Sequence, residues 1–315
     1  MSPRDAWILL AVLSCSGAAA QDVAPPPAPA SPPPCKLLRL SELDLVTQPN
    51  GLISVPASID DHTVFLEVDT GDIRSIVTST VADSLHLDRD RSRMIFELLG
   101  GVQIDQIAYS HSFKLGTLTT GRFPFLVLAA SALNPDTGGL LGPDIMSNYD
   151  VDIDYAHAKF KLFSQDHCPG QVVYWTHDNY AQVPMRVDRN WHIFVPVTLD
   201  GKPLTAVIDT GAERSSMSLA VAKEIFGIDA DNPAIAKHAD ISVNGTAPTT
   251  VYNYPFASLT LEGVAVLHPD IDILPEETFG KGNPQLLIGA SVLRQLHIYI
   301  AYKEQMLYAT AAEAK

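Results

Sequence analysis

The chain carries the same sequence pattern twice. The segment ISVPASIDDHTVFLEVDTGDIRS (53–75) aligns without a gap on IFVPVTLDGKPLTAVIDTGAERS (193–215). In both copies an apolar run ends in Asp-Thr-Gly, so Asp69 corresponds to Asp209 at an offset of 140 positions. Self-similarity of this kind means that one structural unit has been duplicated, and it restricts the chain to folds built from two similar halves.

A second correspondence lies downstream of each Asp-Thr-Gly. NPDTGGLLGPDIM resembles NPQLLIGASVL, which pairs Gly142 with Gly289 at an offset of 147 and gives the second copy about seven more residues. We therefore place the copies at 35–168 and 169–315. NPDTGG contains one more Asp-Thr-Gly at Asp136, but no strand-like run precedes it, so an ordinary turn is predicted there.

Each copy is predicted to consist mainly of strands. Val, Ile, Thr and aromatic residues alternate with polar residues between Gly, Pro, Asn and Asp, as in ISVPASI and HIYIAY. LDGK (199–202) is typical of a hairpin turn. Helices are predicted only at 79–87 and 219–227, with a short turn after each of Gly142 and Gly289. The pattern indicates an all-β fold of two similar lobes.

The two Asp-Thr-Gly loops carry carboxyl and hydroxyl groups that could take part in a reaction. Each aspartate ends an apolar strand and so reaches the edge of a core, where desolvation raises the pKa of a carboxyl group. The hydroxyls of Thr70 and Thr210 can hydrogen-bond to the opposite loop. If the copies pack around a pseudo-twofold axis, Asp69 and Asp209 meet and share one proton. The ionised member then activates a water, and the protonated member polarises a peptide carbonyl.

These motifs, in this order and present twice, resemble the retropepsin-like aspartic proteases, specifically bacterial exported members with two fused repeats. The resemblance covers nearly everything after residue 34. It implies two β-barrel lobes in a pepsin-like bilobal arrangement, with Leu140–Gly142 and Leu287–Gly289 as buried strands that support the loops.

The resemblance also implies an activity. Asp69 and Asp209 would be the catalytic pair of an endopeptidase, with Gly71, Gly211 and the two loop threonines in support. A peptide or protein substrate would bind in extended form, and a monomer would be complete because one chain holds both aspartates. No cofactor is expected. Flap candidates are 97–105 and 242–250, and the alternative for either is an ordinary surface hairpin.

Asp72 departs from the family, which usually has Ala or Ser at this position, as Ala212 is in the second copy. A third carboxylate would raise the pKa of the pair or disturb its shared proton. Alternatively it faces solvent or pairs with Arg74, which is the outcome we expect. This departure keeps a second hypothesis open, in which the chain is a catalytically silent peptide-binding or regulatory protein.

The N-terminal region predicts export. Residues 1–20 combine Arg4, a short apolar stretch and small residues, as in a signal peptide cut after Ala20. The alternative is a lipoprotein box in which Cys15 is acylated. Residues 21–34 are rich in proline and are predicted to form an extended linker. A periplasmic or secreted protein is expected, or one anchored through a lipid on Cys15.

Two cysteines remain in the mature chain. An even number of cysteines in an exported protein predicts a disulfide between Cys35 and Cys168, and two unrelated buried thiols are the alternative. No Cys/His spacing points to a metal.

The charge of the chain excludes one class of partner, and its acidic residues suggest no metal. With 21 basic and 36 acidic residues the net charge is −15, which disfavours binding to nucleic acid. No apolar stretch is long enough for a membrane span. Asp150, Asp152 and Asp154 alternate in DVDIDY but lack the Gly and Glu of a calcium loop, so we expect them on the wet face of a strand.

Overall fold

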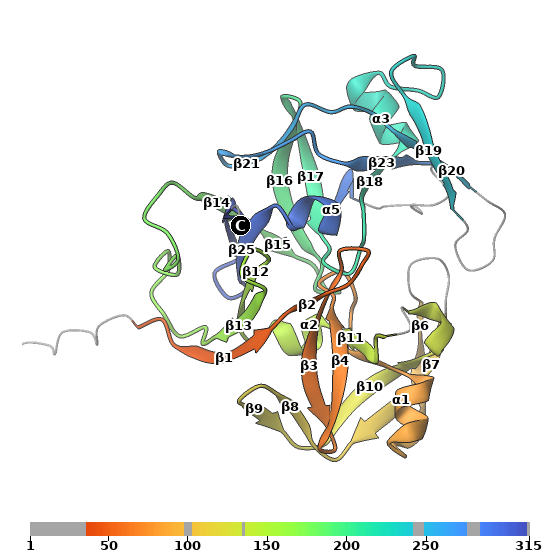
Figure 1. The fold of residues 1–315 in the computed structure, drawn as a ribbon, viewed down its shortest axis with the longest axis vertical. Helices are drawn as coiled ribbons and strands as arrows, with labels where there is room; N and C mark the ends of the chain where they lie inside the picture. The colour runs from red at the N-terminus through yellow and green to blue at the C-terminus, as the bar shows by residue number, and fades with distance from the viewer. Residues whose placement is uncertain (1–35, 98–102, 134–135, 242–248, 276–283, 314–315) are drawn as a thin grey trace, which may run out of the picture. The chain divides into compact units, whose positions relative to one another are not determined.

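Alternating apolar residues form strands through most of the chain. The computed structural model describes residues 36–97, 103–133, 136–241, 249–275 and 284–313, which all belong to one compact unit. Figure 1 shows the two copies as sheets of curled strands with few helices. The predicted signal peptide and linker lie outside the described residues.

The first copy forms a ten-stranded sheet. Its strands are β2 (Val46–Thr47), β3 (Ile53–Ile59), β4 (His62–Val68), β5 (Ile76–Thr78), β6 (Asp88–Glu97), β7 (Gln103–Ser110), β8 (Phe113–Leu115), β9 (Leu118–Thr120), β10 (Phe123–Leu128) and β11 (Gly139–Leu141). They are ordered β6-β7-β10-β5-β11-β4-β3-β8-β9, and β2 pairs with β3.

The second copy repeats this sheet strand for strand. Its strands are β15 (Arg186–Val187), β16 (Ile193–Leu199), β17 (Lys202–Ile208), β18 (Ser215–Ser218), β19 (Ala236–Ile241), β20 (Thr249–Asn253), β21 (Ser258–Leu261), β22 (Val264–Leu267), β23 (Ile271–Leu274) and β24 (Leu286–Ile288). Their order, β19-β20-β23-β18-β24-β17-β16-β21-β22 with β15 beside β16, matches the first copy element by element. The predicted all-β fold of two similar lobes is confirmed.

Corresponding hairpins in the two copies turn in the same way. Asp60 and Asp61 join β3 to β4 with φ of 47° and 63°, and Asp200 and Gly201 join β16 to β17 with φ of 45° and 77°. Two successive positive φ values characterise the turn that suits the twist of a two-residue hairpin. The hairpin predicted from LDGK is therefore confirmed.

Among the described residues, the α-helices occur where they were predicted, and the 3-10 turn was not predicted. They are α1 (Ser79–Ser84), α2 (Pro143–Met146), α3 (Leu219–Phe226) and α5 (Ala290–Leu293), with a 3-10 turn η1 (Ala130–Ala132). Thr78 caps α1 by accepting a hydrogen bond from the Val81 N–H at 3.2 Å, and Ser218 caps α3 in the same way through Val221. The start of each longer helix is thus fixed by a hydroxyl side chain directly before it.

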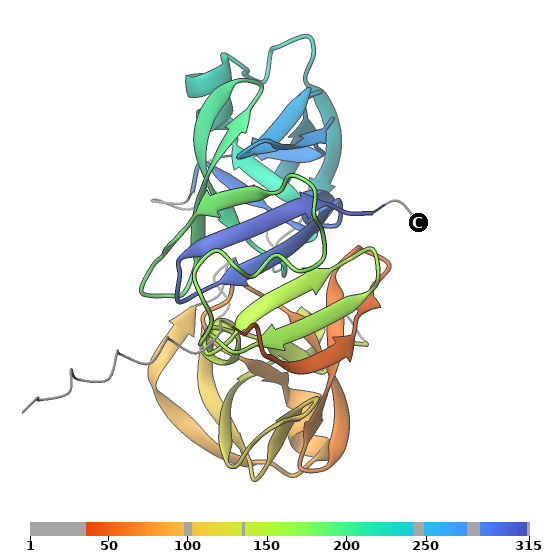
Figure 2. The same cartoon turned by 90° about the vertical axis from the view of Figure 1, so that its left-hand side faces the viewer.

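A third sheet contains strands from both copies. It consists of β1 (Arg39–Asp44), β12 (Asp150–Asp154), β13 (Lys159–Phe163), β14 (Ala181–Pro184), β25 (Leu296–Ala301) and β26 (Met306–Ala311), ordered β1-β13-β12-β25-β26-β14. β12 and β25 pair in antiparallel register, so the two halves of the chain join at the middle of this sheet. Figure 2 shows the six strands between the two lobes. The predicted lobe boundary at 168/169 stays a prediction.

The aspartates of β12 do not lie on a wet face. Asp150 and Asp152 are fully buried and Asp154 is 5% exposed, so the expectation of a solvent-facing strand was wrong. The reason is a covering layer, because Val172, Trp175 and neighbouring apolar side chains pack on the third sheet. Histidine, lysine and tyrosine side chains bond to Asp150 and Asp152, whereas the buried Asp150 Oδ1 has no hydrogen-bond partner among the described residues.

Candidate active site

Parallel strand pairing places each aspartate. β4 lies beside β11, and the backbone N–H of Asp69 donates to the Leu141 carbonyl at 3.1 Å. In the second copy β17 lies beside β24, and the Asp209 N–H donates to Ile288 at 3.0 Å. The Leu-Leu-Gly and Leu-Ile-Gly segments therefore support the two Asp-Thr-Gly loops.

The two loops hydrogen-bond to each other through their threonines. The Thr70 N–H donates to Thr210 Oγ1 at 3.0 Å, and the Thr210 N–H donates to Thr70 Oγ1 at 3.1 Å. Each hydroxyl then donates to a carbonyl of the opposite copy, Thr70 to Ile208 at 2.9 Å and Thr210 to Val68 at 2.7 Å. Both threonines are fully buried, so these bonds hold the loops together without competition from water.

Glycine allows each loop to approach the aspartate of the other. A Cβ built on Gly71 would lie 2.3 Å from the Asp209 Cγ, and one built on Gly211 would lie 2.3 Å from the Asp69 Cγ. Any larger residue would clash with the opposite carboxylate at that distance. The structure thus brings together Asp69 and Asp209, which are 140 positions apart in the sequence.

The environment of the pair raises both pKa values. Burial, and then the negative charge of Asp69, hold the pKa of Asp209 well above its ordinary value. Burial also raises the pKa of Asp69, although its Oδ1 accepts N–H bonds from Gly71 at 2.8 Å and Asp72 at 3.0 Å. The carboxylate of Asp209 accepts the N–H of Gly211 at 3.0 Å. These directions favour a pair in which Asp209 holds a shared proton while Asp69 is ionised.

Asp72 faces neither solvent nor the Arg74 guanidinium, so the outcome we expected for it was wrong. Its side chain is buried and accepts a hydrogen bond from the Ile73 N–H at 2.6 Å. Burial and the charge of Asp69 raise the pKa of Asp72 to about 7. In turn, the charge of Asp72 contributes to the raised pKa of Asp209. The tight loop after Asp69 folds the side chain inward, toward the pair.

The sequence reasoning missed one group that supports the site. Asp144, at the start of α2, accepts hydrogen bonds from the Ser75 backbone N–H at 2.9 Å and the Ser75 hydroxyl at 2.7 Å. In the second copy Ser291 bonds to Ser215 at 2.9 Å in the same way. The repeat alignment could have revealed this pair, since Asp144 and Ser291 each stand two residues after the glycine of their copy.

Other predicted residues lie away from the site or outside the described residues. Asp136 is exposed in a turn, as predicted for the extra Asp-Thr-Gly. The tips of both flap candidates fall outside the described residues, beyond the hairpins β6–β7 and β19–β20. Cys35 does as well, so its predicted disulfide with Cys168 stays a prediction. In the described part of the chain no helix is long and apolar enough to cross a membrane.

A comparison with family profiles decides which family this site belongs to. The profile described as aspartyl protease matches residues 55–145 and 195–292, one match for each Asp-Thr-Gly loop. The chain belongs to the aspartyl protease family. Two separate matches within this family agree with the internal repeat and with the retropepsin-like resemblance.

Solved structures agree on the fold of this aspartyl protease chain. Soybean basic 7S globulin has a TM-score of 0.50 at 10% identity, covering 89% of this chain and 96% of its own. Conglutin gamma, a basic 7S globulin from lupine seeds, has a TM-score of 0.55 at 11% identity, covering 87% of this chain and 95% of its own. A search of curated protein sequences gave no match. At these identities the similarity concerns the fold alone.

Proposed function

We propose that the chain is an aspartic endopeptidase that hydrolyses peptide bonds with Asp69 and Asp209. One observation carries the proposal: the two loops are cross-bonded by Thr70 and Thr210 so that each aspartate lies against the other loop. Ionised Asp69 accepts a proton from a bound water, which attacks the peptide carbonyl. Asp209 holds the proton that polarises this carbonyl and then passes to the leaving amine.

The proposed substrate is a peptide segment in extended form. Extended chains bind to sheet proteins through their backbone, which leaves side chains to enter separate subsites. Because both aspartates belong to one chain, the proposed enzyme is complete as a monomer. It requires no metal, since the pair itself activates the water.

A second candidate function is peptide binding without turnover. Asp72 puts a third carboxylate beside the pair, and the two similar solved structures described above are named globulins. The fold alone therefore does not imply hydrolysis. In this alternative the cleft holds a peptide, and replacing either aspartate with Asn leaves binding largely intact.

Incubation of the purified chain with a diverse peptide library between acidic and neutral pH separates these candidates. The proposal expects new peptide termini in the mass spectrum, with a pH profile set by the raised pKa values of the pair. If the folded protein retains library peptides but cuts none of them at any pH, peptide binding without turnover is the function.

We further propose that residues 1–20 export the protein and that residues 21–34 act as a linker. The intact mass of the exported chain tests the processing site. A mature chain that begins at Gln21 supports a free periplasmic or secreted protein. A chain that begins at an acylated Cys15 instead identifies a lipoprotein.

A further inference from the structure

An arginine that occurs in both copies has different surroundings in each. Arg74 and Arg214 occupy equivalent positions, five residues after Asp69 and Asp209. Arg214 is held by two carboxylates, since its Nε donates to Asp272 at 2.6 Å and its Nη2 donates to Asp270 at 2.6 Å and to Asp272 at 2.8 Å. Its charge is therefore neutralised within its own lobe.

The first copy lacks the corresponding carboxylates. In the second sheet Ser216 pairs with Asp272, and at the equivalent place in the first sheet Ile76 pairs with Leu126. Leu126 thus stands where the second copy has Asp272, and Pro124 stands where it has Asp270. Both positions that would neutralise Arg74 are apolar.

Arg74 is accordingly left with weak contacts. None of the ion pairs within the described ranges includes it, and its guanidinium lies 5.8 Å from the centre of the Phe96 ring. Its charge also acts on Asp144, where burial raises the carboxyl pKa and Arg74 partly offsets that effect. No hydrogen bond of the Arg74 guanidinium to another described residue accompanies the contact with the Phe96 ring, so its N–H donors are available for a ligand.

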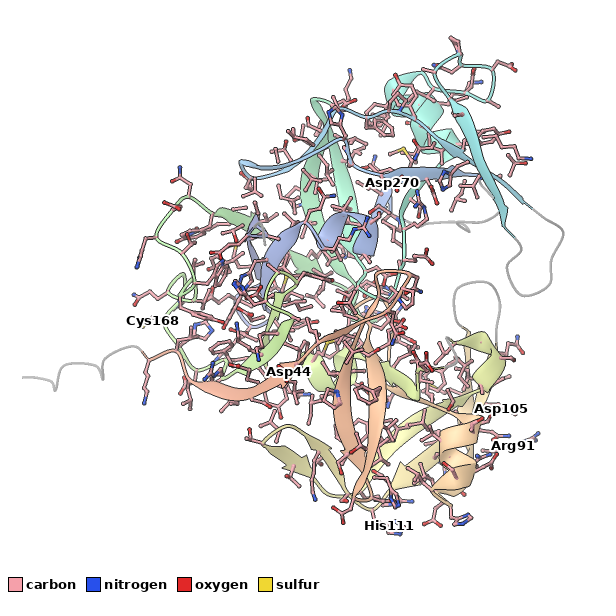
Figure 3. All side chains as sticks on the ribbon, viewed as in Figure 1. Asp44, Arg91, Asp105, His111, Cys168 and Asp270 are labelled. Atoms are coloured by element: carbon pink, nitrogen blue, oxygen red, sulfur yellow. The ribbon has the colours of Figure 1, made fainter. Side chains whose placement is uncertain are left out.

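Arg74 lines a cavity of about 540 Å³ between its own loop and the strands β6, β7 and β10. Phe96, Ile107 and Leu126 give the cavity apolar walls, and Arg91 and Arg93 add positive charge. Asp90 also lines it, and Arg91 lies 3.6 Å from the exposed Asp105. Figure 3 labels Arg91 and Asp105 beside each other at this edge of the first lobe, and Asp270 in the other lobe.

We infer that this cavity is a substrate subsite that selects an acidic side chain, Asp or Glu, near the scissile bond. Its donor is the Arg74 guanidinium, which can bind a carboxylate through two parallel N–H bonds. Three arginines and one aspartate give the lining a positive balance on a chain whose net charge is −15. The inference rests on the proposed function, because it names the substrate class of that same site.

Matched peptides test the inference by kinetics. A cleaved peptide is remade with Glu or Gln at each position in turn, and kcat/KM is measured for every pair. At one position we expect Glu to be preferred about tenfold, because a hydrogen bond between two charged groups is stronger than one to the neutral Gln amide; tenfold corresponds to about 1.4 kcal/mol. Arg74→Gln should bring the ratio close to one, and Arg74→Glu should shift the preference to Lys.

A control variant separates this role from general damage. Arg89 lies on β6, the strand that carries Arg91 and Arg93. It pairs with Asp83 at 2.7 Å and does not line the cavity. Arg89→Gln should keep the full preference for Glu. Equal rates for Glu and Gln at every position, or a preference that survives in Arg74→Gln, would overturn the inference while leaving the proposed hydrolysis intact.

Peptide binding to an Asp209→Asn variant distinguishes failure of the inference from failure of the proposed function. Labelled octapeptides with Glu or Gln at a single position are titrated by fluorescence anisotropy, with and without Arg74→Gln. One outcome is that the wild-type chain cuts no peptide, while Glu peptides bind about tenfold tighter than Gln peptides and lose this advantage in Arg74→Gln. In that case the subsite stands and the proposed hydrolysis is wrong. Equal affinities for Glu and Gln peptides would overturn the subsite.

Discussion

At the scale of single residues, the site is a pair of carboxylates with a third carboxylate that only one of the two copies supplies. Asp69 and Asp209 are related by the repeat, but Asp72 stands opposite Ala212 and is buried. Because a negative charge nearby disfavours ionisation, Asp72 biases the pair toward holding its proton. The two copies are therefore alike in geometry and different in charge.

Replacing Asp72 should move the pH profile. Ionised Asp72 raises the pKa of Asp209, so Asp72→Ala should lower that pKa and cause the shared proton to be lost at lower pH. The basic limb of kcat/KM against pH should shift to lower pH, and Asp72→Asn should shift it in the same direction because the charge is removed in both. A limb that stays in place or moves to higher pH would show that Asp72 does not act on the pair.

The threonine bonds predict a loss of stability. Thr70→Val removes the hydroxyl that accepts the Thr210 N–H and donates to Ile208. Leaving a buried N–H and a buried carbonyl unpaired costs about 1 to 3 kcal/mol for each group. Urea unfolding should show this loss for Thr70→Val and a much smaller loss for Thr70→Ser, which keeps the hydroxyl. Equal stability of the two variants would contradict the role given to the hydroxyl.

At the scale of elements, the joint between the halves is the pairing of β12 with β25. The face of this pair that points away from the main core carries Asp150, Asp152 and Asp154. Asp152 accepts hydrogen bonds from Tyr174 at 2.9 Å and lies 3.0 Å from His297 Nε2 on β25. Polar bonds as well as backbone pairing thus connect the copies.

Removal of Asp152 should destabilise this joint. Its side chain is fully buried and lies 3.4 Å from Lys161 Nζ. The other carboxylate near this Nζ, that of Asp154, is farther away at 3.9 Å. Breaking a buried ion pair by removing one partner costs about 3 to 5 kcal/mol, so urea unfolding of Asp152→Ala should show a loss of that order.

The exposed ion pair between Asp44 and Lys159, at 2.6 Å, provides the control. Asp44 is labelled in Figure 3, and its side chain is 80% exposed. Asp44→Ala should leave the urea midpoint almost unchanged, as is usual for surface pairs. If Asp152→Ala unfolds at the same urea concentration as Asp44→Ala, the buried network does not stabilise the joint.

The sequence predicted the elements of each copy better than the contacts between them. The repeat and its apolar alternation located the Asp-Thr-Gly loops, their supporting strands and both longer helices. The burial of β12 could not be read from DVDIDY, because it depends on a later segment around Trp175 that covers the sheet. The inward direction of Asp72 likewise depends on the path of the loop backbone, which composition does not reveal.

At the scale of the whole molecule, a duplicated chain supplies both halves of one site. Strand order is the same in both lobes, and the third sheet is symmetric about the β12–β25 pair. The second copy neutralises Arg214, whereas the first leaves Arg74 beside a cavity. The two copies thus share one strand order but differ at this position, where one holds an internal ion pair and the other lines a cavity.

Cleavage by the two single variants, alone and mixed, tests the central claim that one chain forms the whole catalytic pair. Asp69→Asn and Asp209→Asn should each lower kcat by at least about a hundredfold, the scale of general acid–base catalysis. An equimolar mixture of the two should stay inactive, because no molecule in it carries both aspartates in one site. Activity restored in the mixture would show that the pair forms between chains, and full activity in either variant alone would show that the pair is not catalytic.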